Sequence, residues 1–157
     1  MKRVFVDANI VIDLLCERYP WFPKVLRIFS MGDLGQIDLY CSSLSLGTAS
    51  YIMETRKLST QDIFDGIALL CKMCTPTTID ESVVMSALTS GFTDFEDALQ
   101  YYSAQTVNAD CIVTRNKKDF SASEIPVYEL DEFLDMMEQR LSRRMPTPPG
   151  RRCTPHP

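Results

Sequence analysis

Histidine is nearly absent from the sequence, and its scarcity limits the chemistry available to the protein. The single histidine among 157 residues, His156, stands between two prolines at the far end of the chain. A Ser-His or Cys-His catalytic pair needs an imidazole held in a fixed geometry, which this position does not supply. If the protein is an enzyme, we therefore expect its side-chain chemistry to rest on carboxylates.

Long apolar runs and a disulfide framework are also missing. No segment approaches the roughly 20 apolar residues of a membrane-spanning helix, and the chain opens on a strand-like segment rather than a leader. The six cysteines are scattered through apolar segments, which is typical of reduced, mostly buried thiols. The lone C-x-x-C pair, Cys71 and Cys74, lacks the second ligand pair of a zinc site. We therefore expect a cytoplasmic protein without membrane contact.

Acidic residues are absent after Glu138, whereas five arginines follow it. Setting these five aside leaves 11 basic against 21 acidic residues, so the preceding body carries a net charge near −10. Such a body repels nucleic acid unless metal ions or a local basic patch intervene. From Pro146 on, the chain is rich in Pro, Arg and Thr, and we assign residues 142–157 to a disordered tail.

Strand-like and helix-like segments alternate over residues 1–141. Apolar, β-branched runs predict strands, and apolar residues at helical spacing predict helices. The predicted strands are Arg3–Val6, Ile37–Cys41, Thr77–Ile79, Cys111–Val113 and, more weakly, Pro126–Tyr128, and the last predicted helix is Asp131–Leu141. This alternation implies a parallel sheet covered on both faces. We expect one α/β domain, a three-layer αβα sandwich with four to five parallel strands.

Acidic side chains follow the first strand and open a later helix. Asp7 directly follows the first strand, and ligands of open α/β sheets bind beyond the carboxyl ends of the strands. Asp7 can instead simply cap the next helix, a common role of Asp. Thr93 to Glu96 forms a T-x-x-E capping box, so Thr93 is expected to cap a helix that carries Asp97 in its first turns.

Strand ends and helix starts share one edge of a parallel sheet, where several of these side chains should meet. We expect this convergence for Asp7, Thr48, Asp94, Asp97 and Asn116. Carboxylates brought this close repel one another unless a cation lies between them. Oxygen ligands without histidine or thiolate indicate Mg²⁺ or Mn²⁺, which can polarise a phosphoryl oxygen and lower the pKa of a bound water.

Three motifs in order resemble the PIN domain family, over essentially all of residues 1–141. They are Val6–Asn9 with Ile12–Leu14, Asp94–Ala98, and Ile112–Phe120. The chain is most similar to the prokaryotic branch that includes the VapC toxins of toxin–antitoxin pairs. The resemblance implies a Mg²⁺- or Mn²⁺-dependent ribonuclease, an antitoxin partner protein and a homodimer. Exposed apolar residues on the predicted helices at Pro23–Phe29 and Ser59–Cys71 are candidate docking surface for the antitoxin.

The resemblance also implies roles for individual residues. Asp7 and Asp97 match carboxylates of the family, so both are expected to be catalytic and to hold the metal. Asn116 matches a position that is often Asp and can still orient a metal-bound water. Asp94 is a further candidate ligand, and Asp119 is either an outer helper or a turn residue.

The basic residues beside the third motif are candidate contacts for RNA. Arg115, Lys117 and Lys118 can hold the phosphate backbone, or they can form an ordinary solvated loop. If they bind RNA, they offset part of the repulsion expected from the acidic body.

Two departures from the family pattern keep other functions open. Thr48 stands where many members carry Glu, and Asn116 is also uncharged, so a second metal should bind weakly or only with RNA. One alternative is therefore a PIN-like module that binds RNA or protein without cleavage. A haloacid-dehalogenase-like phosphatase is another, although Asp7-Ala8-Asn9 lacks the second Asp of its D-x-D motif. A response-regulator receiver would need a Lys that Tyr128–Leu130 does not offer.

Overall fold

The computed structural model describes residues 2–144, which form a single five-stranded sheet with helices packed on it. All paired strands are parallel, and their order is β3-β2-β1-β4-β5. The strands are β1 (Lys2–Val6), β2 (Ile37–Ser42), β3 (Thr75–Thr77), β4 (Cys111–Val113) and β5 (Val127–Tyr128). The helices are α1 (Ala8–Leu15), α2 (Phe22–Asp33), α3 (Ser43–Thr55), α4 (Thr60–Met73), α5 (Glu81–Leu88), α6 (Phe95–Thr106), the 3₁₀ helix η1 (Lys117–Phe120) and α7 (Leu130–Arg144).

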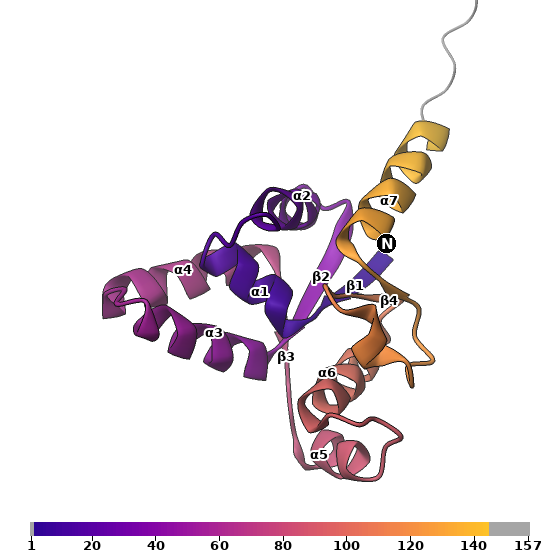
Figure 1. Ribbon diagram of the computed structural model, residues 1–157. Helices are drawn as coiled ribbons and strands as arrows, with labels where there is room; N and C mark the ends of the chain where they lie inside the picture. Colours follow the sequence, from indigo (N-terminus) through magenta and orange to yellow (C-terminus); the bar gives the residue numbers. More distant parts are fainter. Residues whose placement is uncertain (1, 145–157) are drawn as a thin grey trace, which may run out of the picture.

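Helices cover both faces of the sheet. Side chains alternate between the two faces along each strand, so neighbouring residues of one strand are buried in different cores. Val4 and Val6 of β1 are fully buried in a core shared with residues of α1, α2, α3, α4 and α7. Phe5, between them, is buried in a second core with Tyr101 and Ala104 of α6. Figure 1 shows α5 and α6 on the opposite side of the strands from α1 to α4. The predicted αβα sandwich is confirmed, with five strands.

The strand order changes direction between β1 and β4, and this change positions the site. From β1 the chain steps outward to β2 and β3, then returns to place β4 on the other side of β1. In open α/β sheets, ligands bind at such a switch point, beyond the carboxyl ends of the strands. Asp7 follows β1 and Thr114 follows β4, so the topology brings these two residues to the switch point.

Two predictions of local structure are wrong by one or two residues. β3 covers Thr75–Thr77 rather than Thr77–Ile79. Pro76 is tolerated there because β3 is an edge strand, where one side needs no N–H donor. Helix α6 is capped by Asp94 rather than Thr93, since Asp94 Oδ1 accepts a hydrogen bond from Asp97 N at 3.1 Å. Asp caps helices at least as well as Thr, so the cap forms one residue later.

The last helix runs past the expected end of the domain at Leu141. Helix α7 continues to Arg144, and the rest of the predicted disordered tail lies outside the described residues. Within residues 2–144, no helix is both long and apolar enough to span a membrane.

Candidate active site

A pocket of about 330 Å³ lies at the carboxyl edge of the sheet, and five carboxylates line it. These are Asp7, Asp94, Glu96, Asp97 and Asp119, and the rest of the lining comes from Ala8, Asn9, Ile12 and Thr48. The acids come from three separate segments: the end of β1, the start of α6 and η1. The structure therefore brings together four of the residues expected to converge, Asp7, Thr48, Asp94 and Asp97.

Asp7 is held in place by two hydrogen bonds. Its side chain is buried, with the residue 5% exposed. Oδ1 accepts from Ala8 N at 2.7 Å, and Oδ2 accepts from Thr114 Oγ1 at 2.8 Å. The first bond caps α1, so Asp7 is both a helix cap and a pocket residue. Burial raises the pKa of Asp7 to about 6, although its two hydrogen bonds oppose the rise.

Asp97 lies in the first turn of α6 and carries a second perturbed carboxyl group. Partial burial, followed by the charges of Asp7 and Asp94, raises the pKa of Asp97 to about 7. Asp119 and Glu96 act in the same direction. When no cation is present, Asp7 and Asp97 therefore lose their protons closer to neutral pH than ordinary carboxyl groups do, and the pocket favours the binding of positive charge.

Asn116 does not line the pocket but supports a residue that does. Its Nδ2 donates to Asp119 Oδ2 at 2.7 Å, and its backbone N donates to Thr114 Oγ1 at 3.1 Å. The Thr114 hydroxyl thus connects Asp7 to the chain that carries Asn116. We expected Asn116 at the site and Asp119 as a helper or turn residue. In the structure Asp119 lines the pocket, and Asn116 fixes its carboxylate.

Two further pocket residues were missed by sequence reasoning. Glu96, considered only as part of a capping box, has an exposed side chain that lines the pocket. Asn9 lines it as well, and its buried Oδ1 has no hydrogen-bond partner. A buried oxygen without a donor is costly, so it suits a position that contacts a ligand. The sequence did contain one indication of both residues, because Glu96 and Asn9 each lie within two residues of a predicted ligand.

The donor set fits Mg²⁺ or Mn²⁺. Carboxylates, the unpaired amide oxygen of Asn9 and the hydroxyl of Thr48 are the oxygen ligands that these hard cations prefer. Within residues 2–144, no three Asp, Glu, His or Cys side chains are arranged to hold an ion together. Mg²⁺ usually keeps several waters and binds proteins through one or two carboxylates, so a site of this kind does not need such a cage.

The three basic residues predicted to contact RNA have different surroundings. Arg115 is largely buried, with its side chain 20% exposed, and it pairs with Asp13. Lys117 Nζ pairs with Glu132 at 3.2 Å, while Lys118 is exposed. RNA binding by these residues stays a prediction, and the surroundings of Arg115 favour another role.

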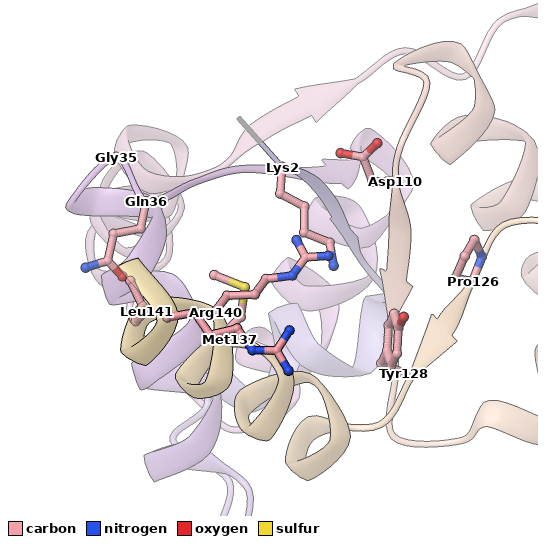
Figure 2. A pocket seen from close by; sticks show the side chains of 10 residues that line it. Lys2, Gly35, Gln36, Asp110, Pro126, Tyr128, Met137, Arg140 and Leu141 are labelled. Carbon is pink, nitrogen blue, oxygen red and sulfur yellow. The ribbon is translucent and has the colours of Figure 1, made fainter. Parts of the chain in front are cut away.

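A larger cavity, of about 1120 Å³, lies near the amino ends of the strands, away from the carboxylate pocket (Figure 2). Lys2, Arg140 and Arg143 contribute positive charge to its lining, beside Tyr128 and Asp110. Arg140 and Arg143 lie near the carboxyl end of α7, where the helix dipole favours cations even without a ligand. The cavity is lined by one carboxylate only, so the carboxylate chemistry belongs to the smaller pocket.

Comparison with known proteins gives the same fold. The sequence model of the PIN domain matches residues 3–118. Ribonuclease VapC1 from Aquifex aeolicus (strain VF5) is 26% identical over 140 residues, covering 85% of this chain and 94% of that protein.

Two solved structures share the fold at low identity. VapBC2 from Rickettsia felis, bound to a DNA fragment from their promoter, matches with a TM-score of 0.60 and 12% identity. That match covers 81% of this chain and 98% of the other. VapBC-1 from nontypeable Haemophilus influenzae matches with a TM-score of 0.58 and 15% identity, covering 82% and 98%. Together these matches confirm the resemblance predicted from the three motifs.

Proposed function

Because the chain belongs to the PIN domain family, we propose that it is a metal-dependent ribonuclease that hydrolyses RNA phosphodiester bonds. The observation that carries the proposal is the raised pKa of both Asp7 and Asp97 in a pocket lined by five carboxylates. Carboxyl groups that retain protons near neutral pH are suited to exchange them for a cation. The Aquifex aeolicus relative is itself named a ribonuclease, which agrees with this assignment.

We assign Mg²⁺ or Mn²⁺ to the carboxylates of Asp7, Asp97 and Asp94, with Glu96 and Asn9 as further oxygen donors. When bound, such a cation supplies Lewis-acid chemistry, polarising a phosphoryl oxygen and lowering the pKa of a nearby water. Thr114 supports this role of Asp7, because its hydroxyl fixes the orientation of the carboxylate and favours the charged form.

Asp119 is the proposed proton acceptor of the reaction. Its carboxylate, fixed by Asn116, lines the same pocket as Asp7 and Asp97. A water molecule attacks phosphorus and gives its proton to Asp119, the bond from phosphorus to the 3′ oxygen breaks, and that oxygen takes up a proton from the solvent. The products are a 5′-phosphate and a 3′-hydroxyl, as the family resemblance implies. Asn116 acts through Asp119, and Lys118 is a candidate contact for the phosphate backbone.

Cleavage of a mixed RNA pool tests the proposal. Purified wild type with Mg²⁺ or Mn²⁺ should cleave, and Asp7→Asn, Asp97→Asn or EDTA should abolish cleavage. Asp135→Asn, which removes an exposed acid of α7 outside the pocket, serves as the control and should cleave normally. Failure of folded wild type to cleave any RNA with either metal would contradict the proposal.

An RNA- or protein-binding module without cleavage is the competing proposal that this experiment also tests. Its support from the sequence is the absence of a carboxylate at Thr48 and Asn116. Glu96 and Asp119 argue against it, because they add two carboxylates to the same pocket. The phosphatase alternative is set aside, because the PIN domain match spans residues 3–118.

We further propose that the protein is the toxin of a toxin–antitoxin pair and forms a homodimer. The resemblance to VapC toxins supports an antitoxin partner, and exposed apolar side chains mark where it would dock. Leu26 of α2, Phe64 of α4 and Leu69 of α4 are all exposed, on the two helices expected to form this surface. Light scattering should give twice the 17.9 kDa chain mass for the free protein.

An inhibition assay tests the docking surface. If a neighbouring gene encodes an antitoxin, that protein should inhibit RNA cleavage by wild type, and Phe64→Ser with Leu69→Ser should weaken inhibition about 10-fold or more. Met85→Ser, which changes an exposed apolar residue of α5, is the matched control. Equal inhibition of all variants would contradict docking on α4.

A further inference from the structure

A buried charge cluster lies beside the candidate active site without lining its pocket. Asp13 of α1 is fully buried, with Oδ2 2.8 Å from Arg115 Nε and Oδ1 3.3 Å from Arg18 Nε. The Cζ atom of Arg115 lies 3.8 Å from the centroid of the Trp21 ring. Arg115 therefore contacts a carboxylate and an aromatic face at once, as planar guanidinium groups can.

A buried ion pair generally adds little net stability compared with apolar residues in its place, so we look for the value of this cluster in fixing a position. Desolvating two charges costs nearly as much as their attraction returns, and an apolar replacement is often as stable. The Nε–H of Arg115 is not aligned for a hydrogen bond, so the contact depends on charge and on the stack over Trp21. A buried ion pair of this kind can specify which segments lie side by side.

The cluster joins two segments that must also lie side by side to form the pocket. Asp13 belongs to α1, whose N-cap is Asp7. Arg115 stands between Thr114, which donates to Asp7, and Asn116, which donates to Asp119. The hydrogen bond from Thr114 to Asp7 joins the segment after β4 to the start of α1. The contact of Arg115 with Asp13 joins the same segment to the same helix a second time.

We propose that Arg115 is a positioning residue that acts together with Asp13 and Trp21. It holds the segment 114–119 against α1, so that Thr114 stays bonded to Asp7 and Asp119 stays at the pocket. The catalytic consequence rests on the proposed ribonuclease function, whereas the attachment itself does not. Direct contact of Arg115 with RNA is the competing role, and it predicts a different set of effects.

Fluorescence tests the attachment without any activity. Trp21 is the single tryptophan of the chain, so the emission reports on the surroundings of this one ring, which include the stack with Arg115. Arg115→Met should change the emission of Trp21 and raise its quenching by acrylamide about twofold. Lys117→Met removes a cation from the same segment but leaves the cluster intact, so it should match wild type.

Mn²⁺ affinity and cleavage kinetics test the consequence. Loss of a residue that orients ligands typically costs 10- to 100-fold in metal affinity or activity. Arg115→Met should therefore weaken Mn²⁺ binding about 10-fold and lower kcat with little change in KM, whereas a role limited to thermal stability leaves both at wild-type values in folded protein. If Arg115 contacts RNA instead, KM should rise while Mn²⁺ affinity and Trp21 quenching stay unchanged, which would overturn the proposal.

A second variant keeps the test decisive if Arg115→Met does not fold. Arg115→Lys retains the charge beside Asp13 but loses the planar stack, so it should raise quenching of Trp21 and weaken Mn²⁺ binding several-fold. Wild-type values in this folded variant would overturn the proposal. If wild type neither cleaves RNA nor binds Mn²⁺, the proposed function fails, and quenching of Trp21 alone decides whether the attachment exists.

Discussion

At the scale of single residues, Asp7 carries an electrostatic cost in the cation-free protein. Its pKa is about 6 when folded, against 3.8 for the free group. Between these values the folded state binds the proton that the unfolded state has lost, so stability falls as pH rises. Above the folded pKa the full cost, about 3 kcal/mol, is present.

Asp7→Asn removes this cost because it stays neutral. In EDTA at pH 8 the variant should be more stable than wild type, by up to about 3 kcal/mol, and the difference should vanish towards pH 4. Urea unfolding at pH 4.5, 6 and 8 measures it. A difference that does not change with pH would contradict the raised pKa of Asp7.

The hydrogen bond from Thr114 to Asp7 leads to a second prediction at the scale of single residues. Its hydrogen bond to Asp7 Oδ2 lowers the pKa of Asp7, so Thr114→Val should raise that pKa further. Protons then compete better with the cation, and Mn²⁺ binding at pH 7 should weaken about 10-fold. A Mn²⁺ titration at pH 8.5 should show a smaller loss of affinity, because Asp7 is deprotonated at that pH in both proteins. Thr114→Ser keeps the hydroxyl, so equal losses in both variants would contradict this explanation.

At the scale of secondary-structure elements, Asp94 connects the start of α6 to the pocket. Its carboxylate caps the helix through Asp97 N, and its charge raises the pKa of Asp97. Asp94→Ala removes both effects and should cost about 1 kcal/mol of folding stability. Asp94→Ser keeps the cap without the charge, so it should retain stability but still weaken Mn²⁺ binding. Thermal unfolding and Mn²⁺ titration of both variants separate the roles, and equal destabilisation by Ala and Ser would contradict the cap.

The order of the elements could be predicted from the sequence, but several side-chain positions could not. Apolar runs placed four of the five strands to within one residue at each end. The third strand was predicted two residues too late, because Thr77 and Ile79 looked more strand-like than Thr75 and Pro76. Topology then predicted that Asp7 and Asp97 would share an edge. It could not show that Asn116 bonds to Asp119, because that depends on how the turn into η1 directs each side chain.

The burial of Arg115 was equally inaccessible to sequence reasoning. A basic residue in a loop with two lysines is typical of a solvated or RNA-binding surface. Its partners Asp13 and Trp21 are about a hundred residues away in sequence and meet it only in the folded protein. Glu96 was missed for a similar reason, because the capping box gave its carboxylate a local role.

At the scale of the whole molecule, the excess of 21 acidic over 16 basic residues allows cations to bind in many places. If Mn²⁺ binds only at the pocket, its effect on folding stability should depend on the carboxylates of the pocket. Mn²⁺ at about 100 times its Kd should stabilise the fold by about 2.7 kcal/mol, or roughly 5–10 °C in Tm. Asp97→Asn should lose most of this shift and Asp135→Asn none. An equal shift in all three proteins would show that the ions act elsewhere.

Diffraction from crystals grown with Mn²⁺, recorded for its anomalous signal, locates the cation directly. We expect a peak within coordination distance of the carboxylates of Asp7 and Asp97 in wild type, and none there in Asp97→Asn. Such a peak would identify the pocket at the carboxyl edge of the sheet as the metal site of a nuclease. Peaks only at other acidic positions, at Mn²⁺ concentrations that support RNA cleavage, would contradict that assignment.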